Sequence, residues 1–172
     1  ILMEFRKNDI VTLEIVDCGT DGEGIGKADG FTVFVKDAVI GDTVTAKIMK
    51  AKKNYGYGRL MEILNASPYR VEPVCPSARQ CGGCQLQAVS YEEQKVFKEK
   101  KLRGHLERIG GFTNLPMEPL IGMDEPYHYR NKAQFPVGRN KEGKIVAGFY
   151  AGRTHAIIEN RDCALGIPEN KD

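Results

Sequence analysis

Cysteine spacing is the feature of this sequence that most restricts its fold. Three cysteines, Cys75, Cys81 and Cys84, lie within ten residues, and a fourth, Cys163, stands alone far downstream. Four thiolates suit a tetrahedral zinc ion or an iron-sulfur cluster, and either site commonly takes several ligands from one tight loop. Zinc sites more often show two paired C-x-x-C arms. The spacing therefore favours an iron-sulfur cluster, with zinc as the alternative.

The cysteines also bear on the cellular compartment. Residues 1–7 lack the basic and apolar segments of a secretory signal. The total of five cysteines is odd, and three in one loop pair poorly with one distant partner. Disulfide-bonded or free cysteines are therefore the less favoured alternative, and a reducing, cytoplasmic location is predicted. Cys18, which is left over from the set of four, is interpreted as a buried structural thiol.

The distribution of charge is more informative than its total. The 172 residues carry a formal net charge of +2 and contain no apolar run long enough to cross a membrane, so a soluble protein is expected. Residues 47–59 hold five cations and no carboxylate, and residues 127–153 hold six cations against Glu142 alone. Two basic islands in a nearly neutral chain indicate a polyanionic partner.

Short strands dominate the first third of the chain. Residues 9–17 alternate between apolar and polar side chains, and further strands are predicted at 31–35, 42–49 and 57–64. This spacing is typical of a small β-barrel of the OB type, placed here at residues 1–68. The glycine-rich run 22–26 precedes no helical pattern, so it is interpreted as a bulged strand or mobile loop and not as a dinucleotide-binding loop.

One segment of this barrel combines cations with aromatic rings. Lysines and arginine can neutralise phosphates, and tyrosines can stack on bases, so the mixture suits single-stranded RNA. The alternative is a solvated basic loop whose tyrosines cap the barrel core. The candidate RNA-binding residues are Lys50, Lys52, Lys53, Tyr55, Tyr57 and Arg59.

The rest of the chain, residues 69–172, is predicted to contain one long helix and an antiparallel meander. The helix spans 90–109, with Ser90 and Glu93 as a capping box. The strands are predicted at 129–137, 145–150 and 154–158, and they lead to Cys163. The fold class is therefore mainly β with one long helix (α+β): an OB-like barrel followed by a cluster-binding region.

The order of these motifs resembles a known family. The runs 24–31, 33–35 and 38–44 resemble a TRAM domain, an RNA-binding barrel, and Cys75-x5-Cys81-Gly-Gly-Cys84 follows directly. Together with Cys163, this order resembles the amino-terminal half of the iron-sulfur RNA 5-methyluridine methyltransferases that act on 23S ribosomal RNA. The resemblance implies a [4Fe-4S] cluster bound by the four cysteines.

The resemblance also carries expectations about RNA and catalysis. Segment 129–134 resembles a Tyr-Arg-Asn-Lys core of the family, which makes Arg130, Lys132 and Gln134 candidates for RNA contact, with an exposed strand face as the alternative. Uracil-5 methylation requires a cysteine nucleophile, a base and S-adenosylmethionine. No such site is evident in this sequence, and in the family these elements lie downstream. The chain is therefore interpreted as the RNA-recognition part of a monomeric enzyme, inactive alone.

The helix supports the same interpretation. Val96 and Phe97 fall off its main apolar stripe, so a second packing partner is expected, which in the family is the catalytic domain. Without that partner the chain is expected to fold only marginally. Three alternatives remain open: an independent RNA-binding module, a TRAM-containing methylthiotransferase and a zinc-stabilised structural protein.

Overall fold

The computed structural model describes residues 5–170. Residues 1–4 and 171–172 lie outside the described part, including most of the segment in which no secretory signal was found. The chain forms two compact units. The first comprises Ile1–Glu72 with Ala88–Ser90, and the second comprises Pro73–Gln87 with Tyr91–Asp172.

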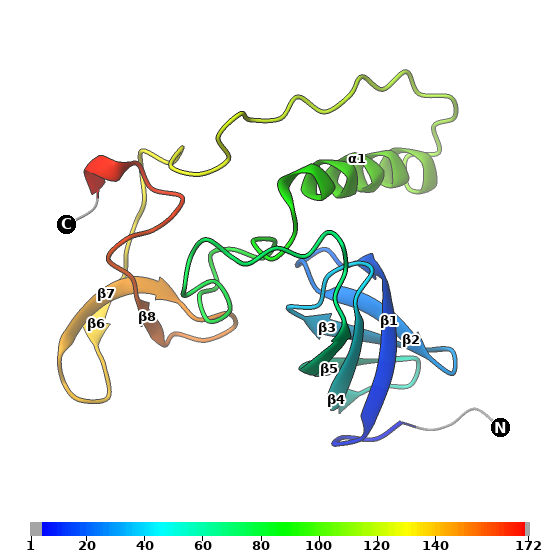
Figure 1. Cartoon of the computed structure of the whole chain (residues 1–172), viewed down its shortest axis with the longest axis horizontal. Helices are drawn as coiled ribbons and strands as arrows, with labels where there is room; N and C mark the ends of the chain where they lie inside the picture. Colours follow the sequence, from blue (N-terminus) through cyan, green and yellow to red (C-terminus); the bar gives the residue numbers. More distant parts are fainter. Residues whose placement is uncertain (1–4, 171–172) are drawn as a thin grey trace. The chain divides into compact units, whose positions relative to one another are not determined.

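The first unit is a closed five-stranded barrel (Figure 1). Its strands follow the order β1-β2-β3-β5-β4, in which β3 and β5 are parallel and the other neighbours are antiparallel. This is the topology of an OB-like barrel, so the predicted fold class is confirmed. The strands are β1 (Ile10–Cys18), β2 (Gly24–Ala28), β3 (Phe31–Lys36), β4 (Thr43–Ala51) and β5 (Tyr55–Asn65).

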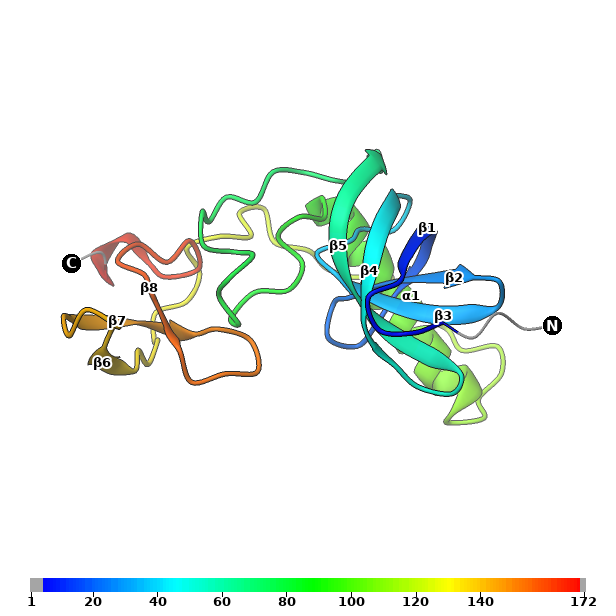
Figure 2. The ribbon, with the colours of Figure 1, turned by 90° about the horizontal axis from the view of Figure 1, so that it is seen from below.

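The barrel interior is filled by the apolar half of each alternating strand. Leu13 and Ile15 of β1 are 1% exposed, and Val33 and Val35 of β3 are fully buried. Gly58 of β5 also lies against this core, because a Cβ there would come within 3.0 Å of Val33 and 3.2 Å of Ala46. The side chains between these inward positions consequently point away from the core. Figure 2 shows the strands curving around the interior.

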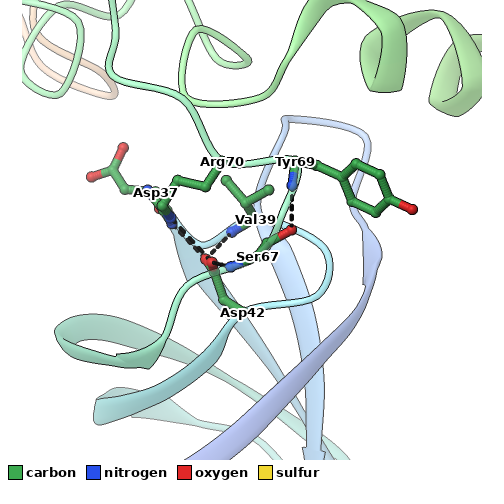
Figure 3. A network of polar contacts seen from close by, with 6 residues as sticks. All are labelled: Asp37, Val39, Asp42, Ser67, Tyr69 and Arg70. Carbon is green, nitrogen blue, oxygen red and sulfur yellow. Dashed lines mark hydrogen bonds and ion pairs between the residues drawn. The ribbon is translucent and has the colours of Figure 1, made fainter.

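A buried carboxylate fixes the loop between β3 and β4. Asp42 is fully buried and accepts hydrogen bonds from the backbone N–H groups of Val39 at 2.7 Å and Ser67 at 2.9 Å (Figure 3). Gly41, with a φ of +90°, lies beside Ser67, whose Oγ would be 2.9 Å from an added Cβ. The chain leaving the barrel is therefore tied to the loop that enters β4.

The second unit contains α1 (Tyr91–Arg108), a three-stranded sheet and a short 3-10 helix, η1 (Pro168–Asn170). The sheet has the order β6-β7-β8 and is antiparallel throughout, which confirms the predicted antiparallel meander. Its strands are β6 (Val137–Arg139), β7 (Ile145–Tyr150) and β8 (Ile157–Glu159).

One strand prediction needs correction. The strand expected at 129–137 is wrong for most of its length, since β6 begins only at Val137. Pro136 precedes this strand and has no N–H to donate to a ladder. Upstream of it, Arg130 instead makes an isolated parallel bridge with Gly166. The run 22–26, by contrast, agrees with the bulged-strand interpretation: residues 24–26 belong to β2, and the β1–β2 register shifts between Ile15 and Asp17, opposite Gly26 and Ile25.

Candidate nucleic-acid interface and cysteine site

The candidate RNA-binding residues of the barrel lie on one outer face. Tyr55, Tyr57 and Arg59 alternate along β5, between positions that face the core. Lys50 of β4 is the register partner of Tyr57, so it lies beside the same row. Lys52 and Lys53 are exposed in the turn between β4 and β5. The structure thus gathers all six barrel candidates onto one hairpin.

Three aromatic rings form a cluster on this face. Tyr57 pairs in register with Phe34 of β3, and their ring centroids are 5.7 Å apart. Tyr55 meets Phe34 and Tyr57 edge to face, with both centroid distances at 5.9 Å. All three rings are half-buried. The cluster therefore keeps part of its ring surface open to solvent on the outside of the barrel.

Cations frame the aromatic cluster. The ammonium group of Lys52 lies 5.3 Å from the centroid of the Tyr55 ring. A side-chain hydrogen bond with Tyr55 raises the pKa of Lys52, so this group stays charged at neutral pH. Arg59 is the register partner of both Lys36 on β3 and Lys47 on β4. Positive charge therefore borders the rings at the loop end and along the strands.

Phe34 is the residue of this face that the sequence interpretation missed. The alternation of β3 contains the signal, because Val33 and Val35 point into the barrel and Phe34 must then point outward. A phenylalanine in an apolar strand is easily attributed to the core. The parallel pairing of β3 with β5, which brings Phe34 to Tyr57, connects segments that are distant in sequence.

The other three RNA candidates, Arg130, Lys132 and Gln134, belong to the second unit. All three are exposed and alternate along a segment without regular structure before β6. The backbone of Arg130 is fixed by two hydrogen bonds, its N–H to Leu165 O at 2.8 Å and its C=O from Ile167 N at 3.1 Å.

The four cysteines of the second unit line one cavity. Its volume is about 30 Å³, and its wall includes Cys75, Cys81, Cys84 and Cys163. Cys75 and Cys81 are buried, and the other two are half-buried. The fold thus carries Cys163 back to the loop that contains the other three cysteines. Arg130, Phe149 and Asn160 also contribute to the cavity wall.

Polar contacts arrange the cysteine loop. The N–H of Gly83 points to the Cys81 sulfur at 3.4 Å, and the N–H of Cys75 donates to Gln87 Oε1 at 3.1 Å. Gly82 packs tightly against the backbone of Tyr150, 2.8 Å from where its Cβ would lie. Burial raises the pKa of the Cys84 thiol despite its hydrogen bond with Gln87, and the three neighbouring thiols raise it further.

Two features are absent from the described part of the chain. Within residues 5–170, no group of three or more His, Cys, Asp or Glu side chains is arranged to hold one metal ion. No helix of this part combines the length and the apolar character needed to cross a membrane.

Residues 5–61 match the family model of the TRAM domain. The barrel is thus a TRAM domain, as its sequence predicted. Over 165 residues the chain is 48% identical to an uncharacterized RNA methyltransferase of Halalkalibacterium halodurans, covering 96% of this chain and 36% of that protein. It is also 48% identical over 160 residues to an uncharacterized RNA methyltransferase of Clostridium tetani, covering 93% and 34% respectively. The predicted similarity to RNA methyltransferases is confirmed.

The chain spans about a third of the length of these relatives. The crystal structure of Pyrococcus abyssi tRNA (uracil-54, C5)-methyltransferase in complex with S-adenosyl-L-homocysteine has a similar fold, with a TM-score of 0.60. That match covers 92% of this chain and 34% of the other, at 22% identity. At this identity the match shows the fold alone.

Proposed function

We propose that this chain is the RNA-recognition part of an S-adenosylmethionine-dependent methyltransferase that forms 5-methyluridine in 23S ribosomal RNA. In this proposal the TRAM barrel at residues 1–68 grips RNA, and residues 69–172 bind a [4Fe-4S] cluster. The catalytic nucleophile and the cofactor site belong to the remainder of a monomeric, cytoplasmic parent enzyme. The relatives named RNA methyltransferases support the reaction class.

The outer face of the barrel carries the RNA-binding part of the proposal. Aromatic rings can stack on any base, and flanking cations neutralise the backbone, which is how proteins hold single strands. Tyr55, Tyr57 and Phe34 supply the rings within 6 Å of one another, and Lys52 lies against one of them. If these tyrosines only capped the barrel core, the cations beside them would have no evident role.

The second unit has a small apolar core, and this supports the proposal that it binds a cluster. Its buried apolar residues in the described chain are Cys75, Cys81, Val146 and Ala164, whereas the barrel buries a set of ten. Two of these four residues are proposed ligands. A bound cluster would join the cysteine loop to the distant Cys163 and contribute folding free energy that apolar burial does not supply. Burial and repulsion from the neighbouring thiolates disfavour the thiolate form of Cys84, and the positive charge of bound iron would compensate for both effects.

The cysteine site fits such a group in its donor chemistry, since four thiols line the same small cavity. Four thiols from one cavity wall are the ligand set of a [4Fe-4S] cluster, and the Gly83 N–H directed at the Cys81 sulfur is a typical outer contact that tunes it. A bound cluster would order the second unit and help it present RNA, without a redox role. The chain's own residues hold the loop in place through Gln87 and the Gly82 contact.

Helix α1 fits a role in contacting the rest of the parent enzyme. None of its side chains is buried, and Val96 is 54% exposed. Exposed apolar groups on a helix imply a further packing surface. We expect the catalytic domain to cover Val96 and Phe97.

RNA binding tests the first part of the proposal. The 172-residue chain is titrated into fluorescently labelled fragments of 23S ribosomal RNA and into transfer RNA, and anisotropy is measured over a range of salt. Tighter binding to ribosomal fragments is expected. Equal or tighter binding to transfer RNA would reassign the substrate, and no RNA binding would overturn the proposal.

Metal analysis tests the second part. The chain and Cys163→Ser are purified without oxygen, and iron, sulfide and zinc are quantified with the visible spectrum. About four iron and four sulfide in the native chain, and loss in the variant, are expected. Cys18→Ser, which leaves the four cavity cysteines intact, is the matched control. Stoichiometric zinc without visible absorption would contradict the cluster.

A further inference from the structure

A second, larger cavity lies in the unit that holds the cysteines. Its volume is about 370 Å³, near the lower end of the range of about 300–1,000 Å³ that ligand pockets occupy. The apolar part of its wall includes Ala133, Phe135, Ile145 and Ala147. All four residues belong to the second unit, and none of them lines the cysteine cavity. The larger cavity therefore has room for one small ring system outside the proposed cluster site.

Strand β7 and an aromatic pair build the apolar part of this cavity. Ile145 and Ala147 occupy alternate positions of β7 and are exposed, whereas Val146 between them is buried. Phe149 follows on the same face of the strand as Ala147, and its ring centroid lies 4.8 Å from that of Phe135. Phe135 is half-buried. A second ring therefore holds the Phe135 ring in place, and part of Phe135 stays accessible to a stacking partner.

The larger cavity shares part of its wall with the cysteine cavity. Cys163 and Asn160 line both cavities. Phe149 lines the cysteine cavity and packs on Phe135, which lines the larger one. The backbone N–H of Asn160 donates to Ala147 O at 3.1 Å, which ties the shared wall to β7. A cluster bound at Cys163 would therefore hold one wall of the larger cavity in place.

Polar side chains complete the wall of the larger cavity. The Oδ1 atom of Asn160 accepts a hydrogen bond from the Asp162 N–H at 3.0 Å, and its Nδ2 forms none with the described residues. Arg161 and Glu159 also line the cavity, and their charges are paired with each other at 3.1 Å. Asp162 adds a carboxylate to the same wall. These side chains disfavour a phosphate inside the cavity, but they offer an amide donor and a carboxylate acceptor to the edge of a neutral ring.

The larger cavity lies next to the RNA candidates of the second unit. Ala133 in its wall stands between Lys132 and Gln134 in the sequence, and both of these residues are exposed. Proteins that read single-stranded RNA commonly take a base out of the stack, place it against an aromatic side chain and bind its edge with hydrogen bonds. Phe135 and Asn160 supply these two kinds of contact in one cavity.

We infer that the larger cavity is a subsite for one unstacked nucleobase of the substrate RNA, with the base against Phe135 and its edge toward Asn160. This inference rests on the proposed function. Lys132 neutralises the backbone beside that base, outside the cavity. The wall shared at Cys163 then gives the cluster a part in presenting RNA, because the cluster orders a base-binding site.

Two matched substitutions test the inference. Ala147→Phe places a bulky ring in the wall of the larger cavity, and Ala156→Phe adds the same ring at an exposed position that lines neither cavity. Ala133→Leu fills the cavity from another segment and replaces Ala147→Phe if that variant does not fold. Circular dichroism and iron content verify the fold and the cluster of each variant.

The probe is a 20-nucleotide single-stranded RNA that carries 5-iodouridine. Ultraviolet cross-linking with peptide mass spectrometry locates the bases on the protein, and anisotropy gives the affinity at two salt concentrations. The unaltered chain should cross-link at Phe135 as well as at the barrel tyrosines. Ala147→Phe should lose the Phe135 cross-link and about 5- to 150-fold in affinity, the range for one stacked base, with an unchanged salt slope. Ala156→Phe should retain both.

The possible outcomes separate this inference from the proposed function. Equal affinities and cross-links in the two phenylalanine variants would overturn the inference and leave the proposed function intact. Cross-links at the barrel and none at Phe135 would also overturn it, and would assign the cavity to packing within the parent enzyme. Failure of the unaltered chain to bind RNA would overturn both.

Discussion

Arg70 donates two hydrogen bonds to the buried carboxylate of Asp42, from Nε at 3.1 Å and from Nη2 at 2.5 Å. The same Nη2 also donates to the carbonyl of Asp37 at 2.8 Å. Asp42 lies between β3 and β4, 28 residues before Arg70, which follows the last strand of the barrel. Asp42 is fully buried, and the Arg70 side chain is 19% exposed. This ion pair closes the loop between β3 and β4 against the segment that leaves the barrel (Figure 3).

The first prediction concerns the pH dependence of the barrel. Burial alone would raise the pKa of Asp42, but hydrogen bonds from Arg70, Ser67 and Val39 outweigh it and lower the pKa below 3.8. Its stabilising contribution is therefore present above that unfolded-state value and is lost as pH falls through the lower folded value. Asp42→Asn should lower the free energy of unfolding by about 3 kcal/mol at pH 7 and flatten its decline in acid.

Urea unfolding of both proteins between pH 2.5 and 7 measures this effect. Asp29→Asn, at an exposed turn position with a φ of +47°, is the control and should behave like the unaltered chain. Parallel pH profiles for the native chain and Asp42→Asn would count against the role given to the ion pair.

The second prediction separates stacking from charge. Phe34→Leu keeps an apolar side chain but removes a ring, so affinity for single-stranded RNA should fall about 5- to 150-fold, the equivalent of 1–3 kcal/mol per base. The salt slope should stay unchanged, because no cation is lost. Anisotropy titrations at two salt concentrations check both quantities. Ile10→Ala, an exposed apolar change on β1 of the same barrel, should bind normally, and equal losses in the two variants would contradict the stacking role.

The third prediction addresses the cations of the barrel face. Replacing Lys52, Lys53 and Arg59 together with alanine should weaken RNA binding and reduce the salt slope by about two units. A variant with Lys95→Gln, Lys100→Gln and Arg103→Gln in α1 provides the charge-matched comparison. A slope equal to that of the native chain would remove the barrel hairpin from the RNA-binding surface.

The fourth prediction concerns removal of the iron-sulfur cluster proposed at the four cavity cysteines. If the cavity cysteines hold a cluster, oxidation followed by chelation should loosen the second unit and leave the barrel intact, because the barrel has its own apolar core. Limited proteolysis with mass spectrometry should then show new cleavage only in residues 73–87 and 91–170. Cleavage that is unchanged after iron removal would show that the second unit does not depend on the cluster.

The sequence alone was most informative where local pattern decides structure. Alternation along β1 identified its inward face, and the number and spacing of the cysteines identified the four that line the cavity. The helix bounds agree to within one residue at each end, since its start and stop depend on nearby residues. The strand expected at 129–137 was wrong because Pro136 has no N–H to donate to the ladder, and Arg130 upstream pairs with the distant segment around Gly166.

By itself, then, the sequence determined an OB-like TRAM barrel, a lysine-rich helix and a set of four cysteines, because periodicity and spacing are properties of neighbouring residues. Only the tertiary structure brought Phe34 to Tyr57, Arg70 to Asp42 and Cys163 to the other three cysteines. These contacts join segments far apart in the chain. They depend on strand pairing and loop closure, whose geometry no local pattern specifies.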